Sequence, residues 1–109
     1  MSIRLPAAIA LYVDAENSGD VDSLSECFAP AASVRDEGRT YRGLQAIREW
    51  KAETKRKYNH TVTPLEVAHR ERATIMKARL DGDFPGSPVT LQFRFVLEGG
   101  KIAALEIGT

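Results

Sequence analysis

Few side chains in this 109-residue sequence could do acid–base or nucleophilic chemistry near neutral pH. There are one cysteine, Cys27, and two histidines, His60 and His69. His60 directly precedes an extended apolar segment, and histidine changes its charge near neutral pH, so it is a candidate base or ligand-binding residue. The sequence favours an exposed position at a strand edge for His60 over either of these roles. His69 is the weaker candidate because Arg70-Glu71-Arg72, which follows it, is typical of a turn.

Cys27 and Trp50 fit a hydrophobic core at least as well as a reactive site. Cys27 falls on the apolar stripe of a short predicted helix, which favours core packing over nucleophilic chemistry. Trp50 could offer its indole N–H to a ligand or anchor a helix in the core. No spacing of cysteine and histidine resembles a zinc site, so we expect neither a metal nor another cofactor. A single cysteine cannot form an internal disulfide, which points to a reducing compartment and a cytoplasmic location.

The charge balance argues against a nucleic-acid partner. Fifteen Lys and Arg residues match fifteen Asp and Glu residues, without the basic surplus that phosphate backbones require. The densest positive run, Lys51 with 55–57, falls where a helix is expected to end, and there cations complement the helix dipole. No apolar run approaches the ~20 residues of a membrane span, so we expect no membrane association.

The first half of the sequence predicts three helices. The first covers 6–17, with Pro6 in its first turn, and the second begins at Asp20 and ends at Pro30. The third covers 44–57 and presents a single apolar stripe that includes Trp50. Its charged positions are expected to face solvent: Arg48, Glu49, Lys51, Glu53 and Lys55.

The rest of the sequence predicts strands. Two short strands at 32–36 and 40–42 precede the third helix, and four long ones follow it, at 61–69, 72–80, 89–98 and 101–107. Gly99-Gly100 predicts a tight hairpin between the last two. Segregated helices and antiparallel strands indicate one α+β domain, which spans 1–109. In 89–98 alternate residues are apolar, so one sheet face should turn toward the helices and enclose a cleft for a small apolar molecule.

Several short motifs, taken in order, cover nearly the whole chain. They are Tyr12-Val13-Asp14-Ala15, Asn17-Ser18-Gly19-Asp20, Cys27-Phe28-Ala29, Ala32-Ser33-Val34-Arg35-Asp36, Gly43 with Ala46-Ile47-Arg48-Glu49, Gln92-Phe93-Arg94-Phe95, and Gly99-Gly100-Lys101-Ile102. In this order the sequence resembles the nuclear transport factor 2-like superfamily, and within it the ketosteroid isomerases and SnoaL-like cyclases. The resemblance implies a cystatin-like cone, in which three N-terminal helices pack on a strongly curved, mainly antiparallel sheet. It also implies a homodimer whose sheet faces meet.

The resemblance also implies a catalytic pair. Tyr12 falls where the isomerases keep their oxyanion-stabilising tyrosine and Asp36 where they keep their general base, 36 − 12 = 24 residues later. A carboxylate can take a proton from the carbon next to a carbonyl while a phenol donates to the enolate oxygen. The second oxyanion donor of that family, a protonated aspartate, is matched here by Leu91. Losing one such donor costs on the order of 10²–10³ in turnover, which argues against steroid isomerisation.

Alternatives remain for both members of the pair. Asp36 could be a strand-end carboxylate that accepts hydrogen bonds from the turn at Gly38, and Tyr12 a helix residue with its hydroxyl at a cavity rim. The residues expected to contact a ligand beside this pair are Trp50, His60, Leu91 and Phe93.

We therefore expect a domain that binds a small hydrophobic molecule, with isomerase, cyclase or lyase activity that needs no cofactor. A non-catalytic ligand-binding or dimerisation module is the alternative, because Leu91 replaces an acid and convergent polar groups are scarce. A protein-interaction adaptor, like nuclear transport factor 2 itself, has less support. Because the superfamily hosts many activities, the fold alone does not decide among these.

Overall fold

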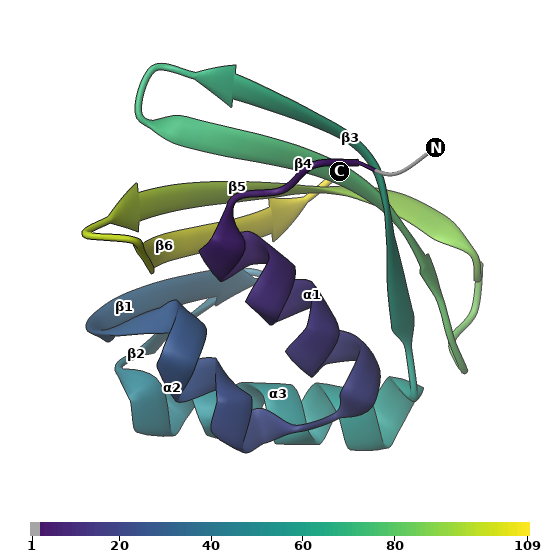
Figure 1. Cartoon of the computed structure of the whole chain (residues 1–109). Helices are drawn as coiled ribbons and strands as arrows, with labels where there is room; N and C mark the ends of the chain where they lie inside the picture. The colour runs from purple at the N-terminus through teal and green to yellow at the C-terminus, as the bar shows by residue number, and fades with distance from the viewer. Residues whose placement is uncertain (1–2) are drawn as a thin grey trace.

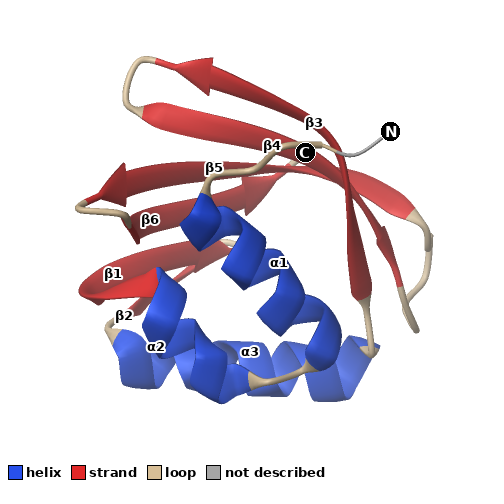
Figure 2. Cartoon of the chain, in the orientation of Figure 1, coloured by secondary structure: helices blue, strands red, loops and turns tan. Residues whose placement is uncertain are grey.

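The computed structural model describes residues 3–109, which form three helices packed on the concave face of one curved sheet (Figures 1 and 2). This confirms the predicted α+β cone. The helical elements are α1 (Ala7–Ser18), a 3₁₀ turn η1 (Val21–Ser23), α2 (Leu24–Cys27) and α3 (Leu44–Tyr58). The strands are β1 (Phe28–Asp36), β2 (Arg39–Arg42), β3 (Thr61–Arg70), β4 (Ala73–Asp81), β5 (Val89–Glu98) and β6 (Lys101–Gly108).

The sheet is mixed but mainly antiparallel. Its strand order is β2-β1-β6-β5-β4-β3, and only the contact between β1 and β6 is parallel among the described strands. The chain reaches this parallel pairing because α3 and the meander from β3 to β6 separate the two strands in sequence. As a result β1, which carries Asp36, lies in the same sheet as the long apolar strand β5, with β6 between them (Figure 1).

The hairpin at Gly99-Gly100 forms as predicted. Both residues have positive φ, 59° and 78°, which glycine adopts without steric cost. Ladder contacts between β5 and β6 begin directly beside the turn, at Glu98 and Lys101. The turn therefore fixes which residues of β5 and β6 share the concave face.

The second helix is much shorter than predicted. It stops at Cys27, because Phe28 already has extended dihedral angles (φ −99°, ψ 142°) and starts β1. Pro30 thus lies inside a strand, where a missing N–H usually interrupts the ladder. The register between β1 and β6 does shift between Phe28 and Ser33, which accommodates the proline. The prediction that Pro30 ends the helix is therefore wrong.

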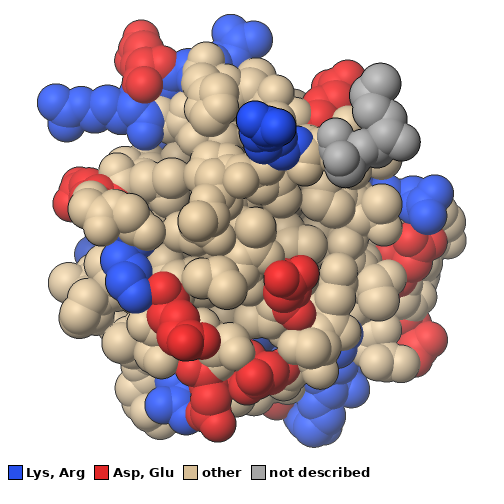
Figure 3. All heavy atoms as spheres, viewed as in Figure 1, with Lys and Arg blue, Asp and Glu red and all other residues tan. Residues whose placement is uncertain are grey.

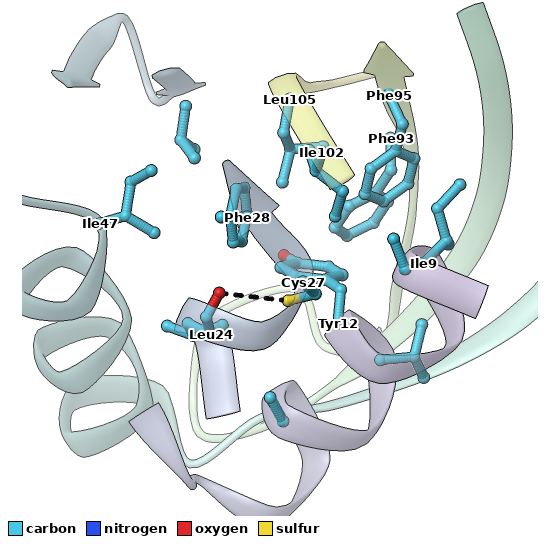
Figure 4. Packing of buried hydrophobic residues seen from close by; sticks show 14 of the residues in the cluster. Ile9, Tyr12, Leu24, Cys27, Phe28, Ile47, Phe93, Phe95, Ile102 and Leu105 are labelled. Atoms are coloured by element: carbon cyan, nitrogen blue, oxygen red, sulfur yellow. Dashed lines mark hydrogen bonds between the residues drawn. The ribbon is translucent and has the colours of Figure 1, made fainter. Parts of the chain in front are cut away.

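Aromatic side chains fill the space between α1 and the sheet (Figure 4). The rings of Phe93 and Phe95 on β5 are buried and meet Tyr12 of α1, with the Tyr12 and Phe95 centroids 5.6 Å apart in an edge-to-face arrangement. Phe28 packs edge-on against the opposite side of Tyr12, at 5.9 Å. This confirms that the alternating apolar residues of β5 face the helices, and it leaves the part of the sheet farther from α1 to form a cavity.

The surface viewed in Figure 3 carries charges of both signs among uncharged atoms. No helix within residues 3–109 is long and apolar enough to cross a membrane.

Candidate functional site

A cavity of about 440 Å³ lies between α3 and the end of the sheet away from the Tyr12 core. Its apolar wall comes from three adjacent strands of the sheet. On β5, Leu91 and Phe93 lie on the same face, and Ile107 of β6 is the register partner of Phe93. The predicted ligand contacts Leu91 and Phe93 are thus both in the lining.

The segment after β4 closes one end of this cavity. Phe84 and Pro85 belong to the lining, and the Phe84 ring packs edge-on against Tyr58 of α3 at 5.9 Å. The backbone N–H of Asp83 donates to the Tyr58 carbonyl oxygen (2.7 Å). Close approach requires a glycine at Gly82, since a Cβ atom there would lie 2.7 Å from the same oxygen. The loop between β4 and β5 therefore folds over the cavity.

Asp36 lies in the cavity lining at the last position of β1. Its Oδ2 accepts a hydrogen bond of 3.1 Å from the indole Nε1 of Trp50. Burial raises the pKa of the Asp36 carboxyl group, and the Trp50 hydrogen bond opposes that rise by stabilising the carboxylate. The structure thus places Asp36, the predicted base, at the cavity with an oriented carboxylate of raised basicity.

Trp50 is buried as the core alternative predicts, and its indole N–H donates to Asp36. Its side chain is buried in the core and also lines the cavity, with the N–H directed at Asp36. The Lys51 ammonium group lies 3.9 Å from the centroid of the Trp50 ring, a cation–π contact. One aromatic side chain therefore contacts both a carboxylate and an ammonium group of the site.

Three charged or titratable residues form a buried cluster at the inner end of the cavity. Glu16 of α1 pairs through Oε1 with both Lys51 Nζ and His60 Nε2, and we call these three residues the Glu16 cluster. The side chains are 1%, 3% and 6% exposed, in the order Glu16, Lys51, His60. All three line the cavity, so the lining has a charged inner end as well as an apolar wall.

The pKa values within the cluster reflect burial and pairing. Burial alone would raise the pKa of Glu16, but the charge of Lys51 and the hydrogen bond with His60 lower it to about 2. For Lys51 the balance is reversed, since burial outweighs the attraction of Glu16 and its pKa is lowered. The carboxylate is therefore firmly ionised, whereas the ammonium group loses its proton more readily than an exposed lysine.

Hydrogen bonds hold α1 in register with β3 next to this cluster. The Asn17 side chain accepts from the Val62 backbone N–H at 2.7 Å and donates to the Val62 carbonyl oxygen at 3.0 Å. Lys55 Nζ donates to the carbonyl oxygen of His60 at 2.5 Å. These bonds fix the chain at His60 and directly after both Glu16 and His60.

Two residues of the cluster were missed or misplaced by the sequence analysis. The charge pattern of α3 predicted an exposed Lys51, which is wrong, because the lysine is 2% exposed and pairs with Glu16. Glu16 follows Tyr12 by one helical turn and so lies on the buried side of α1. A carboxylate on the buried stripe of a helix needs a partner, and that requirement was the signal for a buried cation. The exposed alternative for His60 is also wrong, since His60 is buried.

Tyr12 does not line the cavity, although the resemblance predicted it as the oxyanion-stabilising residue there. Its ring lies in the aromatic core, it is fully buried, and it is not among the residues that line the cavity (Figure 4). Burial and the nearby Glu16 carboxylate raise the pKa of its hydroxyl group. Within residues 3–109 that hydroxyl has no hydrogen-bond partner of good geometry. The structure therefore brings Asp36, Trp50, His60, Leu91 and Phe93 to one cavity and leaves Tyr12 behind its wall.

Other polar atoms of the cluster also lack partners. Across the part of the chain that the structure describes, Glu16 Oε2 and His60 Nδ1 are buried without a hydrogen bond. The same residues include no group of three or more His, Cys, Asp or Glu side chains that could hold a metal ion.

Comparison with known proteins identifies the family. The sequence profile of the SnoaL-like domain matches residues 9–105, and the chain belongs to that family. It is 42% identical to a crystallised protein from Sinorhizobium meliloti described as a proposed polyketide cyclase, with a TM-score of 0.91 over 94% of each chain. No curated protein gives a match to this sequence.

More distant solved structures share the fold. A protein from Catenulispora acidiphila with a ketosteroid isomerase-like fold, crystallised with trimethylamine, has a TM-score of 0.85 at 20% identity and covers 97% of this chain and 87% of its own. IdmH from Streptomyces antibioticus, a proposed polyketide cyclase, has a TM-score of 0.74 at 20% identity over 95% and 91% of the two chains. These comparisons confirm the nuclear transport factor 2-like superfamily and the cystatin-like cone.

Proposed function

We propose that this protein binds a small, mainly apolar carbonyl compound in the cavity and transfers a proton on it, in a cyclase- or isomerase-type reaction. The observation that carries the proposal is Asp36, a half-buried carboxylate held by Trp50 at the wall of an apolar cavity. The 42% identical protein described as a proposed polyketide cyclase supports the same reaction class.

The size and surface of the cavity suit such a compound. About 440 Å³ lies within the range of roughly 300–1,000 Å³ typical of small-molecule sites. Leu91, Phe93 and Ile107 form an apolar wall on the sheet. Asp36 on β1 and Lys51 on α3 supply polar groups to the same lining. A ligand with an apolar body and one polar reactive end matches this division.

Asp36 is suited to move the proton. As a carboxylate it takes a proton from the carbon next to the carbonyl group, and the electron pair shifts to the carbonyl oxygen to give an enolate. Return of that proton to another carbon completes an isomerisation. In a cyclisation the enolate carbon attacks a second carbonyl group of the same molecule, and protonated Asp36 returns the proton to the resulting alkoxide. Neither course consumes a cofactor.

Lys51 supplies positive charge where the oxygen becomes negative. The resemblance assigned oxyanion stabilisation to Tyr12, but the structure leaves Tyr12 out of the lining. Lys51 is the cation in the same lining, and Asp36 and Lys51 both contact Trp50. A charged donor in a buried site is worth more to a developing oxyanion than one in water. We therefore propose Lys51 in place of Tyr12 for this role.

A non-catalytic ligand-binding module is the second candidate. Leu91 lies in the cavity at the position that the resemblance assigns to a second oxyanion donor, and leucine cannot donate. A domain of this kind would bind the same compounds without converting them.

Turnover and binding separate the two candidates. The pure protein is incubated with a panel of small ketones, diketones and lactones, products are sought by mass spectrometry, and affinity is measured by calorimetry. We expect conversion of at least one compound, its loss in Asp36→Asn, and retained affinity in that variant. Binding without conversion in the wild type would support the binding module, and equal turnover in Asp36→Asn would refute the role of Asp36.

We also propose that the outer face of the sheet pairs two copies of the chain. On that face Val96 lies beside its register partner Ala104, and Arg35 forms an ion pair of 3.8 Å with Glu106. Small apolar residues flanked by charges suit an interface of moderate size. Sedimentation at micromolar concentration should give a dimer, and a monomer would contradict the proposal.

A further inference from the structure

We propose that Lys51 is a nucleophile that condenses with the carbonyl group of the ligand to form an iminium ion. This deepens the proposed function and rests on it in one respect, that a carbonyl compound enters the cavity. The chemical class of ligand is then narrowed to aldehydes and ketones, because lactones and esters do not form iminium ions with amines.

Lys51 lies where its nitrogen can meet the carbonyl group of a bound ligand. Its side chain is 3% exposed, and the residue lines the same cavity as Asp36, Leu91 and Phe93. The ammonium nitrogen is held over the Trp50 ring at 3.9 Å and by the Glu16 carboxylate. A ligand whose apolar body lies on the sheet wall would direct its carbonyl end toward this nitrogen.

The surroundings of Lys51 favour its neutral amine form more than the surroundings of an ordinary surface lysine do. The groups that face it are Glu16 on α1, Asp36 on β1 and, through Glu16, His60 before β3, and Lys55 lies on the same helix. The attraction of the two carboxylates is outweighed by burial, so the pKa of Lys51 is lowered. Desolvation of this kind is an established way to activate a lysine for condensation with a carbonyl group.

The step balances without an external reactant. Lys51 first releases a proton to solvent, and its nitrogen lone pair then forms a bond to the carbonyl carbon while the C=O electron pair moves to oxygen. That oxygen takes a proton from the nitrogen to give a carbinolamine, and with a second proton, regained from solvent, it leaves as water. The sum of ammonium and ketone is an iminium ion and water, with the charge unchanged.

Two features of the site favour a covalent bond from Lys51 to the ligand over a role for Lys51 as a hydrogen-bond donor to the oxyanion alone. Tyr12 is not in the lining, and Leu91 stands where the resemblance assigns the second oxyanion donor. An iminium ion accepts the electron pair released at the adjacent carbon more readily than a neutral carbonyl, so it does not need an oxyanion hole. Asp36 remains the group that takes the proton.

Reductive trapping tests the proposal. The full chain is incubated with cyclohexanone and borohydride, which reduces an iminium ion to a stable secondary amine, and the adduct is located by peptide mass spectrometry. The sequence contains five lysines, so exposed Lys77 serves as an internal control. We expect Lys51 to be labelled faster than Lys77 at neutral pH, because burial lowers the pKa of Lys51 and so increases the fraction of its free amine.

Variants distinguish this proposal from the proposed function. Lys51→Arg keeps the charge but removes the amine, and it should lose both trapping at this position and turnover. Asp36→Asn should lose turnover but still be trapped at Lys51. Trapping at Lys51 no faster than at Lys77, or full turnover in a folded Lys51→Arg, overturns the iminium while leaving Asp36 as the base. Because the wild type carries the trapping measurement, misfolding of a variant does not affect it.

Discussion

Glu16 and Lys51, 35 residues apart in the sequence, form an ion pair between α1 and α3 that is almost completely buried. Each charge depends on the other, because an unpaired ion at this depth would cost several kcal/mol of desolvation. The pair also closes the inner end of the cavity. The same contact thus joins two helices and places a cation at the site.

Breaking the pair on one side should destabilise the protein. We expect Glu16→Gln or Lys51→Met alone to lower the free energy of unfolding by about 3–5 kcal/mol, since each leaves an uncompensated buried group. The double variant should lie closer to the wild type than the sum of the two single changes. Urea unfolding of all four proteins gives the coupling energy. Simple additivity of the single effects would show that the two side chains do not interact.

Stability should fall in acid because of Glu16. Its pKa is lowered from 4.5 to about 2 in the folded protein, so its contribution is complete above pH 4.5 and is lost as pH falls toward 2. At roughly 1.4 kcal/mol per pKa unit, this lowering corresponds to about 3–4 kcal/mol for the carboxyl group. Part of that gain is offset at Lys51, whose charged form is disfavoured by burial.

The comparison of two variants isolates this effect. Unfolding free energy measured from pH 5 to pH 2 should fall less steeply in Glu16→Gln than in the wild type. Asp14→Asn, an exposed carboxylate on the same helix, is the matched control and should retain the wild-type slope. An unchanged slope in Glu16→Gln would show that Glu16 does not titrate as proposed.

Removing the indole N–H should raise the pKa of Asp36. The Trp50 hydrogen bond stabilises the carboxylate, so its loss in Trp50→Phe leaves burial unopposed by that bond. We expect the acid limb of the activity profile to move to higher pH, together with the Asp36 signal in a carbon-detected NMR titration. A shift to lower pH, or none, would contradict the assigned hydrogen bond.

Filling the cavity from the sheet should block ligand binding. Leu91→Trp adds an indole to the apolar wall, and we expect the affinity for a bound ketone to fall at least about tenfold, or about 1.4 kcal/mol. Leu65→Trp on β3 is the control, because Leu65 is 44% exposed and does not line the cavity. Calorimetry with both variants should separate them, and equal affinities would place the ligand elsewhere.

The sequence predicted the fold well because its signals are local. The alternation in β5 and the Gly99-Gly100 turn each depend on neighbouring residues, and both are confirmed. The amphipathic pattern of α3 predicts the helix and its buried Trp50, but not the burial of Lys51. The predicted end of α2 was wrong because Phe28 pairs with β6 and so belongs to a strand. That pairing joins residues far apart in the chain.

The site was predicted only in part for the same reason. Asp36, Trp50 and His60 reach the cavity as expected, but the hydrogen bond between Asp36 and Trp50 depends on how β1 and α3 meet. Lys51 has the charge and spacing of a solvent-facing residue, and only its pairing with Glu16 explains its burial. The helical spacing correctly predicted that Tyr12 lies on the buried face of α1, but it did not predict that the side chain lies outside the cavity lining.

Hydrogen–deuterium exchange tests most directly whether Asp36 transfers protons in this cavity. A small cyclic ketone is incubated with the protein in D₂O, and loss of the proton signals next to its carbonyl group is followed by NMR. We predict exchange well above the buffer rate with wild-type protein, and near the buffer rate with Asp36→Asn although that variant still binds the ketone. Wild-type exchange that persists undiminished in Asp36→Asn would contradict the account.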